Sequence, residues 1–170
     1  NLRVSGSQTI VRPEFRELST FQFYDFDLSA TVAGNTGLRR TKISNFDVRY
    51  EMYPRGGELF TFGVFYKYFR DPLEAYINPA SGDGSTYNLL NADEANSFGA
   101  ELEFRKKLDF SPALKNFTVQ GNMSYIYNRV KSLDRAMQGQ SPYLLNAAFQ
   151  YDLEKYGINT TLLFNQIGRR

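Results

Sequence analysis

Cysteine, histidine and tryptophan are all missing from this chain of 170 residues. Without cysteine no disulfide framework can form, and without cysteine and histidine the usual zinc sites are excluded. The same absences exclude Cys–His and Ser–His nucleophile pairs. The charge is nearly balanced, with 20 basic and 18 acidic residues, and this balance does not indicate nucleic-acid binding. We therefore expect a protein that is not an enzyme and has no cofactor, no metal and no nucleic-acid partner.

The sequence also lacks any run of about 18 apolar residues, so it contains no candidate transmembrane helix. A transmembrane β-barrel needs no such run, because lipid-facing and lumen-facing residues alternate along each strand. Aromatic residues are abundant instead, with 15 Phe and 12 Tyr. Several tyrosines fall near the ends of strand-like segments, as they do in the aromatic girdles at membrane interfaces.

Hydrophobicity alternates with a period of two along most of the chain, which predicts β-strands. Most of the predicted strands are longer than the usual length of about 5–6 residues. They match the length of about 9–11 residues with which a tilted strand crosses a bilayer. The sequence thus predicts an all-β fold, a long antiparallel meander of about 7–8 strands. Seven strands are expected at 2–11, 43–53, 58–69, 98–107, 117–129, 143–153 and 158–167.

Six of these segments separate their side chains into an apolar and a polar face. The apolar face has aromatic and aliphatic residues such as Phe46, Leu102 and Phe149, and charges on it, such as Lys106 and Arg129, lie near strand ends. A charge there costs about 0–1 kcal/mol, against about 2–4 kcal/mol for Arg or Lys at the membrane midplane. This distribution predicts an apolar face toward lipid and a polar face toward an aqueous lumen. The charges of the polar face are Asp47, Arg49, Glu51, Lys67, Glu101, Glu103, Arg105, Lys107 and Asp152.

The predicted connections alternate strictly between short and long. The short ones are 54–57, 108–116 and 154–157, and the long ones are 12–42, 70–97 and 130–142. Membrane barrels have short periplasmic turns and long extracellular loops, whereas a soluble sandwich has no reason for this alternation. Residues 20–33 also have a strand-like pattern, so a further membrane-crossing strand there is an alternative. We interpret them as an extended part of an extracellular loop.

Several sequence blocks occur along nearly the whole chain. They read RPEFREL at 12–18, GNTGLRRTKI at 34–43, NFDVRYEMYP at 45–54, ELEFRK at 101–106 and QGQSPYLLN at 138–146. Together they resemble the barrel of TonB-dependent receptors, particularly the Bacteroidetes type that begins with a carboxypeptidase-regulatory-like domain. The Gly-Asn-x-x-Leu element is similar to the family's Gly-Asn-Pro-x-Leu signature, with Thr36 in place of the proline.

The resemblance implies a transmembrane barrel of about 22 strands in the outer membrane of a Gram-negative bacterium. It implies a receptor that takes up an extracellular ligand, which is a siderophore, glycan, peptide or cobalamin. The implied partners are membrane lipid, a plug domain inside the barrel, TonB and the ligand. No signal peptide, plug, TonB box or terminal aromatic strand is visible, so we expect residues 1–170 to be a fragment. The resemblance implies the C-terminal part of such a barrel, roughly a third of it.

No single residue can be assigned to ligand contact, catalysis or metal binding from the sequence. The candidate ligand-facing surfaces are the three long connections. The charges at 101–107 are expected to form a solvated lumen face packed against a plug rather than a solute path. Glu14 and Glu17 have no accompanying nucleophile, and we expect them to pair with Arg12 and Arg16 in a loop. The Gly- and Ser-rich segment 78–88 lacks the Lys-Ser/Thr of a phosphate-binding loop.

Two alternatives stay open at this point. A soluble β-sandwich module, for instance one that binds carbohydrate, would also show alternation and exposed aromatics. It would bury Phe46, Phe62, Leu102 and Phe149 beneath a second sheet and have connections of similar length at both ends. An outer-membrane β-barrel enzyme would need a catalytic set, and none is visible. How an isolated fragment would cover its two sheet edges is also open.

Overall fold

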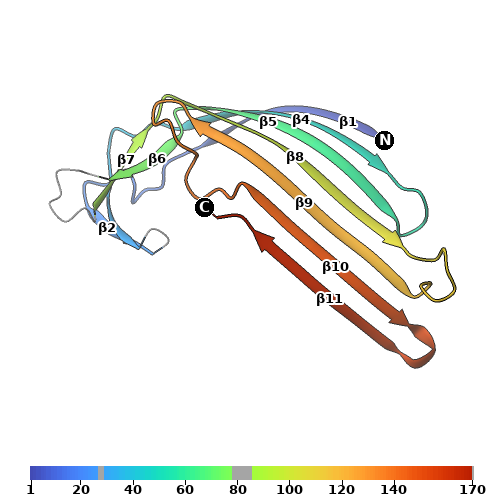
Figure 1. Ribbon diagram of the computed structural model, residues 1–170. Helices are drawn as coiled ribbons and strands as arrows, with labels where there is room; N and C mark the ends of the chain where they lie inside the picture. Colours follow the sequence, from blue (N-terminus) through green and yellow to red (C-terminus); the bar gives the residue numbers. More distant parts are fainter. Residues whose placement is uncertain (27–28, 78–85, 170) are drawn as a thin grey trace.

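A seven-stranded antiparallel sheet with the order β1-β4-β5-β8-β9-β10-β11 dominates the computed structural model, which describes residues 1–26, 29–77 and 86–169 (Figure 1). A short 3-10 turn, Glu154–Tyr156, joins the last two strands. No helix in the described residues is long and apolar enough to span a membrane. The strands of this sheet are β1 (Leu2–Val11), β4 (Thr41–Met52), β5 (Leu59–Arg70), β8 (Glu94–Lys107), β9 (Phe117–Val130), β10 (Tyr143–Leu153) and β11 (Ile158–Ile167).

All seven predicted strands are present, so the predicted all-β meander is confirmed. The largest difference in bounds is at the start of β8, which begins at Glu94 rather than at residue 98. The polar residues Glu94 and Asn96 interrupt the apolar alternation, but the backbone pairing with β5 continues through them, with Glu94 opposite Arg70. The predicted short connections all lie at one end of the sheet and the long ones at the other (Figure 1).

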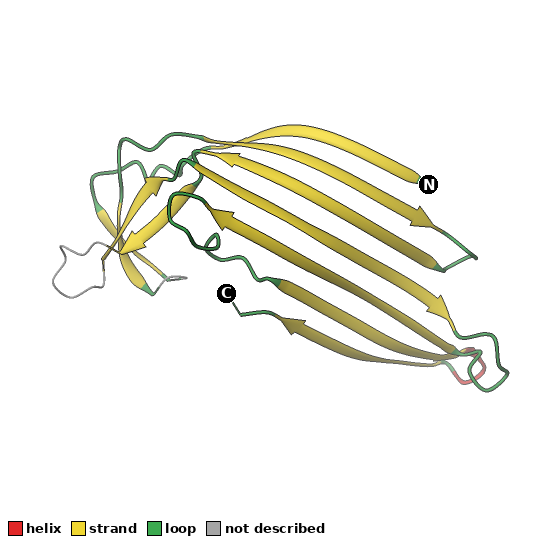
Figure 2. Cartoon of the chain, turned by 45° about the horizontal axis from the view of Figure 1, so that its top comes forward, coloured by secondary structure: helices red, strands yellow, loops and turns green. Residues whose placement is uncertain are grey.

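Cross-strand register joins the apolar residues of neighbouring strands into continuous rows. One row runs across five strands, from Tyr50 through Phe62, Leu102 and Met123 to Leu145. Within it Phe62 keeps 46% and Met123 48% of its surface exposed. In the described residues no second sheet covers this face, so the two-sheet sandwich alternative is wrong. The sheet instead forms a curved, single-layered wall (Figure 2).

A second, four-stranded sheet stands at the end with the long connections (Figure 1). It combines the hairpin β2 (Gln22–Asp25) and β3 (Ala30–Ala33) with the hairpin β6 (Leu73–Ile77) and β7 (Thr86–Asn91), and β3 pairs with β7 in parallel. Residues 20–33 therefore belong to a long connection and do not cross the sheet, as interpreted from the sequence. The prediction for connection 70–97 was incomplete, because this segment contains the strands β6 and β7. Of segment 78–88, residues 78–85 lie outside the described residues.

Most of the buried apolar residues are gathered around this small sheet. One cluster consists of Val32, Ala75 and Leu89. The other consists of Ala92, Ala95 and Val130, where the large sheet meets the long connections. The rest of the large sheet has no comparable core, because it is a single layer with one apolar and one polar face.

Phe65 is an aromatic residue on the polar face of β5, a position that the alternation pattern left unassigned. It lies opposite Gly99 of β8. A Cβ atom added at Gly99 would lie 2.6 Å from Phe65 Cζ and 2.5 Å from the carbonyl oxygen of Tyr125. Gly99 thus leaves the space that the Phe65 ring occupies, an arrangement known from glycines covered by aromatic side chains in sheets.

Replacing Gly99 by alanine is expected to destabilise the sheet by about 1–3 kcal/mol, because the added methyl group overlaps both a ring and a backbone oxygen. Gly6→Ala in β1 is the matched control. A Cβ atom there meets the Phe46 ring at an ordinary 3.7 Å. Unfolding free energies of the two variants check the prediction, and equal values would contradict it.

Candidate functional site on the polar face

A cluster of opposite charges occupies the polar face where β1, β4 and β8 approach. Glu51 is buried and forms two ion pairs. Its Oε1 lies 3.1 Å from Arg49 Nε, and its Oε2 lies 3.2 Å from Arg3 Nη2. Tyr53 also donates its hydroxyl to Glu51 Oε2 at 3.1 Å. Arg49 Nη2 reaches Glu103 of β8 at 3.6 Å. The cluster is therefore charge-compensated and connects three strands.

Small residues stand on the intervening strand, β5, beneath this connection. Register places Gly63 between Arg49 and Glu101, and Thr61 between Glu51 and Glu103. A Cβ atom at Gly63 would touch Arg49 Cγ only at 3.9 Å, an ordinary contact. Side chains of β4 and β8 therefore meet above β5. The sequence predicted that these charges share a face, but it did not predict which of them pair.

A row of carboxamides continues the polar face across β9, β10 and β11. Asn146 Nδ2 donates to Asn122 Oδ1 at 2.7 Å, and Asn165 Nδ2 donates to Asn146 Oδ1. Glu103 stands opposite Asn122 in the register, so the row extends the charged cluster. A carboxamide has two N–H donors and an acceptor oxygen, so each amide keeps hydrogen-bonding capacity beyond this row.

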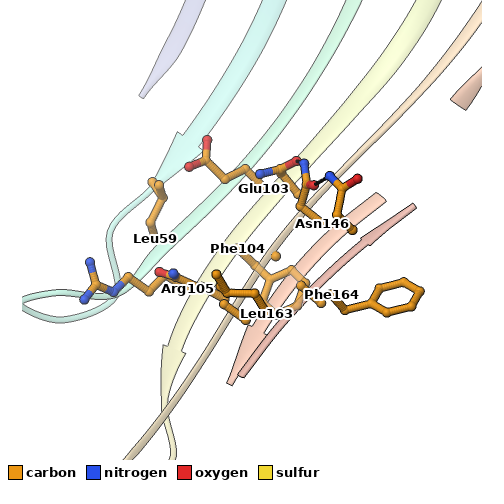
Figure 3. A pocket seen from close by; sticks show the side chains of 13 residues that line it. Leu59, Glu103, Phe104, Arg105, Asn146, Leu163 and Phe164 are labelled. Atoms are coloured by element: carbon orange, nitrogen blue, oxygen red, sulfur yellow. Dashed lines mark hydrogen bonds between the residues drawn. The ribbon is translucent and has the colours of Figure 1, made fainter. Parts of the chain in front are cut away.

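A hollow of 530 Å³ lies along this row on the polar face (Figure 3). Its lining combines the charged residues Glu103 and Arg105, the Asn146 amide, and the apolar side chains Leu59 and Leu163. In the described residues no group of three or more His, Cys, Asp or Glu side chains is placed to hold a metal ion. The hollow thus offers charge pairing, hydrogen bonds and apolar contact to a partner surface.

At the other end of the strands, Asn91 holds two of the long connections together. The Arg39 backbone N–H donates to Asn91 Oδ1 at 2.6 Å, and Asn91 Nδ2 donates to the carbonyl oxygens of Arg39 and Asp71 at 2.9 and 2.8 Å. The Arg39 guanidinium also pairs with Asp71 at 2.7 Å. Residues 52 positions apart in the chain are joined in this way.

The third long connection is attached through β6. Arg135 Nη2 lies 2.9 Å from Glu74 Oε2 and donates to the Ala75 carbonyl oxygen at 3.0 Å. Gln138 Nε2 donates to the same carbonyl at 2.9 Å, and its Oε1 accepts the Ala75 N–H at 3.1 Å. Burial raises the pKa of Glu74 above its usual value, while the Arg135 charge opposes this shift. All three long connections therefore form one cross-linked cap.

The comparison with protein families gives one match over the whole chain. Residues 1–170 match the family described as "TonB dependent receptor-like, beta-barrel". The chain belongs to this family of TonB-dependent receptor barrels. A comparison with the curated proteins found no match.

Solved receptor structures share the fold of this barrel segment. The siderophore receptor PirA from Pseudomonas aeruginosa is 15% identical, with a TM-score of 0.70 over 98% of this chain and 30% of that one. A variant of the ferric enterobactin receptor PfeA from the same organism, in complex with enterobactin, is 17% identical, with a TM-score of 0.66 over 91% and 24%. The copper transporter OprC is 16% identical, with a TM-score of 0.66 over 89% and 21%. The chain spans less than a third of each of these proteins.

Membership in this family shows which environment each face of the large sheet is in contact with. TonB-dependent receptor barrels are outer-membrane proteins of Gram-negative bacteria, so the apolar face is in contact with lipid and the polar face lines the lumen. In bacterial outer-membrane barrels the short turns are generally periplasmic and the long loops extracellular. The predicted location, fold and receptor family are therefore confirmed.

The predicted loop pairs are present in part. Arg16 Nε lies 2.8 Å from Glu14 Oε2, as expected. Glu17 Oε2 instead accepts the backbone N–H of Glu14 at 2.6 Å, which stabilises the turn. Among the residues that the structure describes, Arg12 makes no ion pair, so the pairing prediction is correct for one arginine only.

Asn91, Arg135 and Gln138 were not predicted from the sequence. Their partners lie 20 to 63 positions away, and no local pattern marks them. The one available signal was the polar interruption by Asn91 in an otherwise apolar stretch, Leu89 to Ala92.

Proposed function

We propose that the chain is part of an outer-membrane TonB-dependent receptor that takes up an extracellular ligand. One observation carries the proposal: the sheet places a continuous lipid-facing belt, a polar lumen face and an extracellular cap of three joined connections on the same seven strands. The role is transport rather than catalysis, and it agrees with the lack of histidine and cysteine.

The proposal assigns residues 1–170 to one part of a closed barrel of about 22 strands. In the described residues β1 and β11 each pair on one side only, and a closed barrel satisfies such edges with further strands. The sequence blocks at 12–18, 34–43 and 138–146 support the Bacteroidetes type with a carboxypeptidase-regulatory-like domain.

The partner proposed for the lumen face is the receptor's own plug domain, which TonB would act upon. The compensated cluster around Glu51 and the hollow beside Asn146 offer the mixture of charges, amides and apolar side chains that a protein surface can contact. The candidate ligand surface is the extracellular cap. A siderophore, glycan, peptide or cobalamin is proposed as the ligand class.

Uptake by cells that produce the full-length receptor tests the proposal. Labelled ferric siderophores, oligosaccharides, peptides and cobalamin are supplied with and without a protonophore, which removes the energy that TonB transmits. We expect accumulation of one ligand class that depends on the receptor gene and stops with the protonophore. Uptake that persists with the protonophore would show a passive channel and overturn the proposal.

Because this chain has no cysteine of its own, single cysteines can report its orientation. In a cysteine-free full-length receptor, Thr36→Cys in the cap is expected to react with a membrane-impermeant maleimide on intact cells. Gly56→Cys, in the turn between β4 and β5, is expected to react only after the outer membrane is opened. Labelling of Gly56→Cys on intact cells would reverse the assigned direction of the strands.

A further inference from the structure

A second hollow, of 440 Å³, lies on the lipid-facing side beside the periplasmic turns. Its floor is built from side chains of β9, β10 and β11 that share the apolar face: Phe117 stands opposite Tyr151, and Tyr151 opposite Thr160. Phe149 and Leu162 continue it in the next row. Ala113 and Asn116 of turn 108–116 complete the lining.

Aromatic packing and contacts of the turns surround the hollow. The Phe117 ring is stacked on Phe149 at 4.9 Å between centroids and lies 4.7 Å from the Tyr151 ring. The turn is anchored to β10, because the Asp152 N–H donates to the Asn116 carbonyl at 2.9 Å. It is also joined to the preceding turn by the pair between Arg55 and Asp109 at 3.1 Å.

The position of this hollow determines what can occupy it. It is continuous with the apolar belt, where no water is present to fill an apolar recess and lipid is the solvent. It lies at the periplasmic ends of the strands, which is the depth of the inner leaflet. The exposed Lys115 stands in turn 108–116, whose Asp109 is neutralised by Arg55, and in the adjoining turn the exposed Lys155 stands next to the exposed Glu154.

We propose that this hollow is a binding site for one phospholipid of the periplasmic leaflet. An acyl chain lies on the rings of Phe117, Phe149 and Tyr151, and the phosphate pairs with Lys115 at the membrane surface. Basic side chains at this depth attract anionic head groups, so an anionic phospholipid is favoured over a zwitterionic one. The inference rests on the membrane contact of the apolar face and is independent of the ligand that the receptor transports.

The test is native mass spectrometry of the full-length receptor, delipidated in mild detergent and supplied with phosphatidylglycerol. Wild-type receptor is expected to retain one phospholipid. Ala113→Trp fills the hollow and is expected to lower the affinity by roughly tenfold, the equivalent of about two displaced methylene groups. Ala100→Trp, on the same face but on β8 and distant from the hollow, is the matched control and is expected to retain the lipid.

A second variant leaves the packing of the hollow untouched. Lys115→Glu changes one exposed turn residue and is expected to weaken phosphatidylglycerol retention by roughly fivefold. Three outcomes would each overturn the site. They are an equal loss of lipid affinity in Ala113→Trp and Ala100→Trp, no lipid retained by the wild type, and no effect of Lys115→Glu on retention. Retention of lipopolysaccharide in place of phospholipid would overturn it as well. Ligand uptake is measured in parallel, so a failure here is distinguishable from a failure of the transport proposal.

Discussion

Replacing Met123 by arginine is expected to destabilise the folded receptor by about 2–4 kcal/mol. Met123 lies in the middle of β9 and points to the apolar face, between Leu102 and Leu145. It keeps 48% of its surface exposed, so a larger side chain meets no steric barrier. The cost comes from placing a charge in the hydrocarbon interior. On a water-exposed surface the same substitution would fall within about 0.5 kcal/mol.

Ser124→Arg is the matched control, because this neighbouring residue has the same depth and points to the lumen. There the new guanidinium faces Glu101 across the strand pair, so a change of less than about 1 kcal/mol is expected. Equilibrium unfolding of the full-length receptor in phospholipid vesicles measures both values. A Met123→Arg variant as stable as Ser124→Arg would mean that this face is not in lipid.

The alternation that predicted the sheet is a local property, and for this reason it could be read from the sequence. A single-layered wall between lipid and water imposes its period on every strand, so the faces of Phe62 and Glu103 followed from their own neighbours. The register of neighbouring strands was not predicted; in the structure it joins the apolar residues into rows between short turns. The strand bounds differed most at Glu94, where the backbone pairing continued beyond the apolar pattern.

The cap could not be predicted in the same way. Its parallel pairing of β3 with β7 joins residues about 55 positions apart, for example Thr31 with Thr86, and non-local pairing leaves no periodic signal. Asn91 and Gln138 stabilise it by hydrogen bonds to backbone groups, which any segment can offer. Phe65 was not assigned from the sequence for a related reason. Its ring fits on the polar face because Gly99, on the neighbouring strand, has no side chain.

Replacing Arg135 by methionine is expected to release the third long connection from the cap. Glu74 has a side chain only 3% exposed, and without Arg135 its charge would be buried and unpaired. Removing one partner of a buried pair costs about 3–5 kcal/mol. Hydrogen exchange of the β6 and β7 amides in the full-length receptor is therefore expected to accelerate by roughly two to three orders of magnitude. Exchange in the middle of β9 is the internal control and should stay unchanged.

The pH dependence of this variant identifies Glu74 as the cause. Because burial raises the pKa of Glu74, the folded cap binds that proton more tightly than the unfolded segment does. The contribution of Glu74 to the stability of the cap is present below the ordinary carboxyl pKa. It is lost as the pH rises through the raised pKa of Glu74. Arg135→Met removes the positive charge that opposes this shift, so the loss of cap stability at neutral pH becomes larger. Acidification should restore the protection of the β6 and β7 amides against hydrogen exchange. Glu74→Gln combined with Arg135→Met should restore it at neutral pH, whereas a double variant as open as Arg135→Met would show that the arginine acts through its backbone contacts instead.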